Sequence, residues 1–209
     1  MKLSIFGFIS MLVCCSAGQS QDLKNVSNAE PRSTFELNIN GKKYIVSEDE
    51  ELKLDTLISK PVISVKMSKY KKFNNAYVSF DYPRNLSYEF DEDAGYRNWT
   101  LSGNSFIILV FEIDGETTLA SLLNRMVEKF GKENCTIENY QKELGKRKWN
   151  VEKLHVSIAG QKLILECFDI KLSDTKSRFI YFQDTLEDGR NSTEYEDGFK
   201  MVDSTISFK

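Results

Sequence analysis

Alternating apolar and polar positions over 34–39, followed by an apolar stretch over 44–46, predict two strands near the start of the folded chain. Asn40 and Gly41 lie between them and indicate a two-residue hairpin, because both central residues of such a turn need a positive φ. Residues 61–67 predict a third strand, with proline at its first position, where no ladder hydrogen bond is lost. Together these strands predict a small N-terminal β extension.

The alternation returns at Val78, Phe80 and Tyr82, after a basic linker expected over 68–75. This pattern predicts a strand with one face on the core and the other in water. Pro83 lacks an N–H group and is expected to end the strand. The residues that follow it are expected to form an acidic loop.

Residues 97–101 and 106–112 predict a hairpin around Gly103. The second of these strands is almost continuously apolar, so we expect it to be central and covered on both faces. Residues 119–130 then place apolar side chains at helical spacing, and Gly131 ends the predicted helix. The apolar stripe of this helix consists of Leu119, Leu122, Leu123, Met126, Val127 and Phe130.

A series of strands is predicted after this helix, over 135–143, 148–158, 162–172 and 178–184. Thr193 and Glu196 have the spacing of a capping box, which predicts a short helix ending near Asp203. A final short strand is predicted over 205–208.

The first 17 residues have the order of an export signal. A basic residue precedes a mostly apolar stretch over 5–13, and Cys15 and Ala17 fit the small-x-small rule for cleavage after Ala17. The apolar stretch is shorter than the roughly 20 residues that a transmembrane helix needs. We therefore expect an exported protein, periplasmic or extracellular, with a disordered leader over 18–32. Lipidation at Cys14 or Cys15 is the alternative, although both match the lipidation pattern poorly.

Composition narrows the kinds of partner. The formal net charge is −3, which argues against a nucleic-acid binder, because such proteins usually carry a basic excess. Apolar residues make up 41% of the chain, which is enough to build a core. We expect a monomer.

The order of the predicted elements resembles that of the Mog1/PsbP-like superfamily, which includes the photosystem II accessory protein PsbP and the DcrB-like bacterial lipoproteins. Residues 78–83 look like the opening strand of this family, which ends in Tyr-Pro. The helix over 119–130 lies where the family has its first long helix, and residues 195–208 resemble its closing helix and strand. The similarity covers about 75–209.

The resemblance implies an α+β fold, in which helices flank a central antiparallel sheet. The small three-strand β extension predicted from the residue pattern precedes this sheet and lies outside the family core. The expected divisions are a signal peptide over 1–17, a leader over 18–32, the extension over 33–72 and a Mog1/PsbP-like domain over 73–209. The resemblance also implies a mostly non-catalytic protein that binds or steadies protein complexes at a membrane surface, although fold alone does not fix function.

Residue types that carry catalysis or bind metals are sparse. His155 is the single histidine and is expected on the more polar face of a strand, and the chain has no Gly-x-Ser-x-Gly motif. Cys135 and Cys167 do not make a zinc pattern, and we expect either a disulfide between them or two unreactive core thiols. The acidic segments lack the spacing of a calcium loop, and no glycine-rich loop opens a helix. We expect no catalytic residue, no metal and no cofactor.

A basic cluster around one predicted turn is the candidate docking patch. Trp149 lies among its cations, and Arg and Trp are frequent anchors of interfaces. The alternative is a solvated turn with Trp149 packed inward. The candidate docking patch consists of Lys142, Lys146, Arg147, Lys148, Trp149 and Lys153.

Two functions remain open from the sequence. The first is an exported, non-catalytic binding or accessory module that acts through a protein partner or a membrane surface. The second is a small-ligand carrier or an enzyme with a pocket between the sheet and a helix. A filled core would favour the first function, and a deep pocket lined by polar groups would favour the second.

The signal pattern predicts that export removes the residues through Ala17. Mass spectrometry of the chain recovered from the periplasm or the medium should then find Gly18 or a close neighbour at its N-terminus. An intact Met1 on the folded protein, or a diacylated cysteine, would contradict this cleavage.

Overall fold

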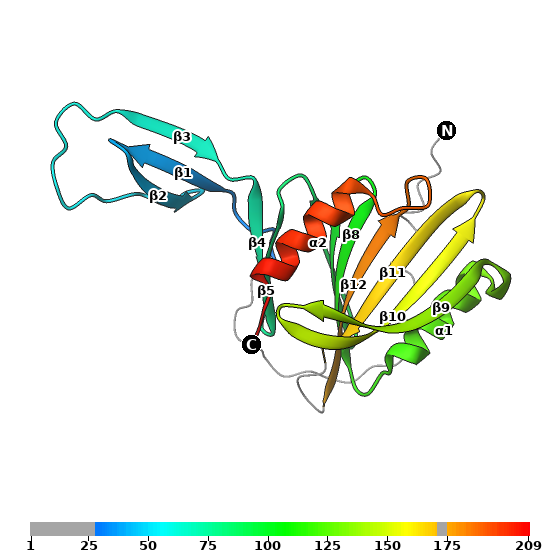
Figure 1. Cartoon of the computed structure of the whole chain (residues 1–209). Coiled ribbons are helices and arrows are strands. Elements are labelled where there is room, and N and C mark those ends of the chain that lie inside the picture. Colours follow the sequence, from blue (N-terminus) through cyan, green and yellow to red (C-terminus); the bar gives the residue numbers. More distant parts are fainter. Residues whose placement is uncertain (1–27, 171–174) are drawn as a thin grey trace.

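A computed structural model describes residues 28–170 and 175–209 (Figure 1). In this part of the chain, strands form three antiparallel sheets of three, seven and three strands, and there are two α-helices. The expected α+β fold, with a central sheet flanked by helices, is therefore wrong. The structure is mostly β, because one face of the large sheet is covered in part by another sheet.

The N-terminal sheet, β2-β1-β3, projects from the rest of the molecule (Figure 1). Asn40 and Gly41 form the turn between its first two strands with φ values of 50° and 85°, so the predicted hairpin is confirmed. The strands are β1 (Thr34–Ile39), β2 (Lys42–Ser47) and β3 (Ile63–Met67).

The seven-stranded sheet has the order β6-β7-β8-β12-β11-β10-β9. Its interior strand β8, next to the central strand β12, is buried at every position but the last, which confirms the predicted two-sided burial of this segment. The strands are β6 (Ser87–Asp93), β7 (Tyr96–Ser102), β8 (Phe106–Asp114), β9 (Cys135–Leu144), β10 (Arg147–Ile158), β11 (Gln161–Asp169) and β12 (Lys176–Thr185).

One face of this sheet is covered by a second three-stranded sheet together with a helix. The covering sheet has the order β13-β5-β4, with strands β4 (Tyr70–Asn74), β5 (Val78–Pro83) and β13 (Ser207–Phe208). The helix α2 (Thr193–Thr205) lies beside β5 (Figure 1). Buried side chains from all these elements form one continuous core, with Phe80 of β5, Val110 of β8 and Tyr195 of α2 among them.

The opposite face is covered by α1 (Leu119–Phe130), as the apolar stripe of this helix predicted. Thr118 caps the helix by accepting a hydrogen bond from the backbone N–H of Ser121, and Gly131 follows its last residue with φ 88°. A short 3₁₀ turn, Lys132–Asn134, then leads into β9.

Three local predictions are wrong. The expected basic linker over 68–75 contains β4, which pairs with β5, so the expected domain boundary at 72 falls inside a strand. The expected acidic loop contains β6, whose Tyr88 and Phe90 pack against the core while its carboxylates face water. The N-cap of α2 is Ser192 instead of Thr193, because its hydroxyl accepts the backbone N–H of Tyr195.

The contact between α2 and the large sheet generates a stability prediction at Gly198. A Cβ at this position would lie 2.4 Å from Cε1 of Phe106, whose ring is fully buried against Phe182 and Tyr195. We expect Gly198→Ala to lower the free energy of unfolding by about 1 kcal/mol or more, because overpacking costs more than the gain in helix propensity. Urea denaturation measures this. The exposed neighbour offers a control, since Asp197→Ala should change stability by less than about 0.5 kcal/mol; an alanine at 198 that stabilises the protein would contradict the packing argument.

Candidate functional site

The register of the N-terminal sheet places apolar side chains on one of its faces. Directly paired residues of antiparallel strands point to the same side of a sheet, and in this sheet Leu37 pairs with both Tyr44 and Val65. We call this side the apolar face. Its apolar residues are Phe35, Leu37, Ile39, Tyr44, Val46, Ile63, Val65 and Met67, and Lys42, which pairs with Ile39, lies at one end of the same side. The other side is mostly polar and carries Ile45 as its exposed apolar residue.

The β3 side of the apolar face is open to solvent, whereas Phe35, Leu37, Tyr44 and Val46 on β1 and β2 are partly buried. Ile63, Val65 and Met67 are 54%, 61% and 47% exposed, and Ile39 is the buried residue at the far end of β1. Large apolar side chains gathered on one surface are typical of a binding site, whereas scattered ones are not. The sequence contains a signal for this surface. Apolar residues alternate within 34–67, but this segment has too few further residues to cover the apolar side of its own strands.

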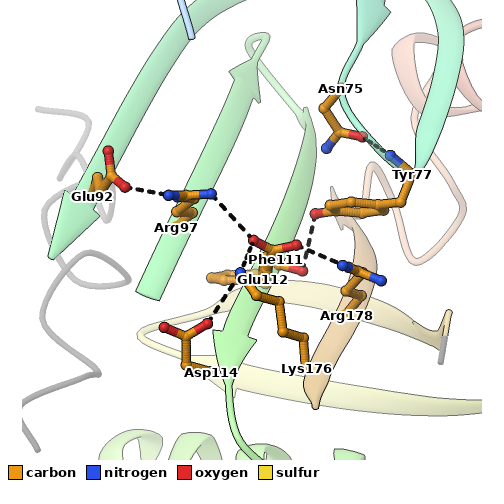
Figure 2. A network of polar contacts seen from close by, with 9 residues as sticks. All are labelled: Asn75, Tyr77, Glu92, Arg97, Phe111, Glu112, Asp114, Lys176 and Arg178. Atoms are coloured by element: carbon orange, nitrogen blue, oxygen red, sulfur yellow. Dashed lines mark hydrogen bonds and ion pairs between the residues drawn. The ribbon is translucent and has the colours of Figure 1, made fainter. Parts of the chain in front are cut away.

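The body of the molecule, meaning the other two sheets with α1 and α2, contains three buried carboxylates on its α2-covered face, namely Glu112, Glu166 and Asp184. The first is Glu112 at the end of β8 (Figure 2). Arg178 Nε and Lys176 Nζ donate to its two oxygens at 2.9 and 2.8 Å, and Arg97 Nη1 donates at 3.4 Å. Arg97 also binds Glu92, so strands β6, β7, β8 and β12 are joined in one row of charges.

Aromatic and backbone groups complete the surroundings of Glu112. The Tyr77 hydroxyl donates to the carbonyl of Phe111 at 3.3 Å, and the guanidinium of Arg178 lies 4.6 Å from the centroid of the Tyr77 ring (Figure 2). Burial alone would raise the pKa of Glu112, but the hydrogen bonds from Lys176 and Arg178 outweigh it and lower that pKa. The carboxylate therefore stays ionised and paired.

The second buried carboxylate, Glu166 on β11, joins α2 to the sheet. It accepts hydrogen bonds from Tyr140 and Lys142 on β9 and from the hydroxyl of Tyr195 on α2. Lys153 Nζ lies 3.6 Å from its Oε1. Burial would raise the pKa of Glu166, and its attraction to Lys142 outweighs burial and lowers that pKa. General acid–base catalysis near neutral pH uses a raised carboxyl pKa, which Glu112 and Glu166 lack. Burial raises the pKa of the third buried carboxyl group, Asp184, whose oxygens accept hydrogen bonds from the backbone N–H and the hydroxyl of Ser192, the N-cap of α2.

The candidate docking patch is divided between two environments. Lys142 and Lys153 point toward Glu166, and Lys142 Nζ lies 3.9 Å from the centroid of the Phe199 ring on α2. Trp149 is half-buried, donates to the carbonyl of Leu144 at 3.0 Å and packs on Phe208. The remaining three residues, Lys146, Arg147 and Lys148, are exposed.

The other candidate residues also lie apart from one another. His155 is partly exposed on β10, with Nε2 3.2 Å from Oε2 of Glu138. Cys135 and Cys167 are free thiols. They are too far apart for the disulfide that the sequence left open. β10 lies between their two strands, and Cys135 and Cys167 pair with residues of β10 that are four positions apart, Val156 and Glu152.

The part of the chain that the structure describes contains neither a cluster of metal-binding side chains nor a helix able to span a membrane. Within 28–170 and 175–209, no three His, Cys, Asp or Glu side chains gather where they could hold a metal ion. In the same ranges, neither α1 nor α2 has the length and apolar composition that a bilayer crossing requires.

Comparison of the chain with protein-family models and with curated proteins finds no match. The resemblance to the Mog1/PsbP-like superfamily therefore stays a prediction from the sequence.

The Glu112 network predicts a pH-dependent stability. Replacing Glu112 by Gln should lower the free energy of unfolding by about 3 kcal/mol near pH 7, because it leaves Lys176 and Arg178 without their buried counter-charge. The folded pKa of Glu112 is below its ordinary value of 4.5, so its stabilising effect is present above that value and is lost as the pH falls through the folded pKa. The gap between parent and variant should therefore shrink below about pH 4.5, as measured by urea denaturation across pH.

Glu92 provides the matched control for this experiment. It binds Arg97 in the same row, but its side chain is 44% exposed. Glu92→Gln should cost less than about 1 kcal/mol. Equal losses for the two variants would contradict a special role for the buried carboxylate.

Proposed function

We propose that the chain is an exported, non-catalytic binding module that contacts a partner protein through the apolar face of its N-terminal sheet. The observation that carries this proposal is the exposure of Ile63, Val65 and Met67 on one side of a sheet that projects from the body (Figure 1). Burial of apolar surface drives most protein association, so this face would gain free energy from a partner.

The interior of the body supports a binding role over an enzyme or carrier. The space between α2 and the seven-stranded sheet is filled by aromatic side chains, with Phe182 5.0 Å from Phe199 and Phe106 5.4 Å from Tyr195 between ring centroids. The polar groups at this interface are engaged with one another around Glu166. A filled interface of this kind favours a scaffold that presents a surface elsewhere.

Export rests on the signal pattern of the sequence. The centre of the apolar face carries no charged side chain, so this face fits the apolar surface of another protein. Because the chain is expected to be exported, we expect its partner to be exported as well.

Site-specific photo-crosslinking tests this function. A photoreactive amino acid replaces Val65 on the apolar face or Ile45 on the opposite face, which are 61% and 65% exposed. Each variant is produced with its own leader in its native host and irradiated in intact cells. We expect an adduct with a second polypeptide, identified by mass spectrometry, at position 65 and at least severalfold less at position 45.

Three outcomes would contradict the proposal. Equal adducts at the two positions would show unspecific contact. Adducts with lipid alone at position 65 would indicate a membrane surface in place of a protein. Adducts that contain this chain alone would show that the face meets another copy and no partner.

A further inference from the structure

The outer edge of the N-terminal sheet has backbone groups available for pairing. β3 is an edge strand in the order β2-β1-β3. The N–H of Ser68 donates to the carbonyl of Thr34 and the N–H of Asn40 donates to the carbonyl of Val62, both at 2.9 Å. The even-numbered residues of β3 therefore direct their N–H and C=O groups toward β1. Because backbone direction alternates along an antiparallel strand, Ile63, Val65 and Met67 direct their N–H and C=O groups outward.

The two edges of this sheet differ in how well they are protected. Natural edge strands avoid pairing with other chains through lysines, prolines and short length. β2 begins with Lys42 and Lys43. β3 has Lys66 as its one charged residue, and Pro61 lies before the strand instead of within it. The edge of β3 is thus the more open of the two to a new strand.

The sequence of β3 is complementary to itself in one antiparallel register. With Val65 opposite Val65 of a second copy, Ile63 lies opposite Met67, and the outward backbone groups of these residues meet as hydrogen-bonded pairs. Apolar side chains then pair on one side of the sheet, and Lys66 lies opposite Ser64 on the other. A register shift of two residues, which moves the two-fold axis from Val65 to Lys66, pairs Lys66 with Lys66, and like charges directly opposite are destabilising.

We propose that β3 pairs with β3 of a second copy of this chain about a two-fold axis at Val65. The product is a six-stranded sheet of order β2-β1-β3-β3-β1-β2, in which the apolar faces of both copies become one continuous surface. A C2 contact of this kind is closed, because each β3 has a single outer edge, so association stops at the dimer. This inference rests on the proposed function, since it gives a dimer contact to the edge of the same sheet whose apolar face is proposed to bind the partner. It proposes a dimer in place of the expected monomer.

Sedimentation velocity of the purified exported chain over a range of concentrations tests the dimer. We expect a reversible monomer–dimer equilibrium in the parent chain. Val65→Lys and Val65→Glu each place two like charges at the axis, and each should raise the dissociation constant at least about tenfold, a change of 1.4 kcal/mol. Ile45→Lys, the same change at an equally exposed residue of the opposite face, should leave the constant within about twofold.

Mixing the two charged variants distinguishes a lost dimer contact from misfolding, because misfolded variants would not associate when mixed. Lys at 65 in one copy lies opposite Glu at 65 in the other, so an equimolar mixture should form a heterodimer more tightly than either variant forms its homodimer. A monomeric parent chain at all concentrations, an equal loss with Ile45→Lys, or a mixture that stays monomeric would overturn the dimer.

The two proposals fail in different experiments. A monomeric parent chain that still gives a partner adduct at position 65 in cells overturns the dimer alone. A purified dimer whose position 65 gives adducts with this chain only supports the dimer and removes the partner protein.

Discussion

The body of this protein depends on covering both faces of an interior strand of its large sheet, β8. Eight of its nine residues are buried, and each face therefore requires a separate apolar layer. The α1 helix supplies one layer through Leu119, Leu122, Leu123 and Met126. The other layer is too wide for one helix, and α2 shares it with the strands β13, β5 and β4. This division of the second face makes the molecule a mostly β protein, with helices as partial covers.

The ion-pair networks of the buried carboxylates Glu112 and Glu166 follow from the same constraint. A sheet buried on both faces must satisfy any charged group that its strands carry inward, because an unpaired buried charge is costly. Glu112 meets this requirement with cations from β7 and β12, and Glu166 meets it with groups from β9, β10 and α2. Each network joins segments that are distant in sequence, so each specifies strand order and helix position in a way that apolar contact alone would not. Their geometry explains how Glu112 and Glu166 are accommodated inside the body.

Local patterns in the sequence predicted the elements that local interactions determine. The α1 stripe, the Asn40–Gly41 hairpin and the apolar strand over 106–111 are all found in the structure. β4 and β6 were missed because lysines and carboxylates occupy their solvent sides and hide short alternating patterns around residues such as Phe73 and Phe90. Strand order could not be read locally, since partners such as Glu112 and Arg178 are 66 residues apart. The open apolar face was equally hidden, because alternation shows which residues share a side and does not show whether anything covers that side.

The contrast between the body and the N-terminal sheet connects stability to recognition. In the body, apolar faces are buried by other elements of the same chain, whereas the β3 end of the N-terminal sheet keeps side chains such as Val65 largely in water. A three-stranded sheet with one apolar face is close to the smallest unit that is stable by itself, and packing against another surface adds to its stability. A ligand that binds only the folded sheet stabilises it in proportion to the logarithm of its concentration over its dissociation constant. Under the proposed function, recognition and local folding at this sheet would therefore share one source of free energy, namely the burial of its apolar face.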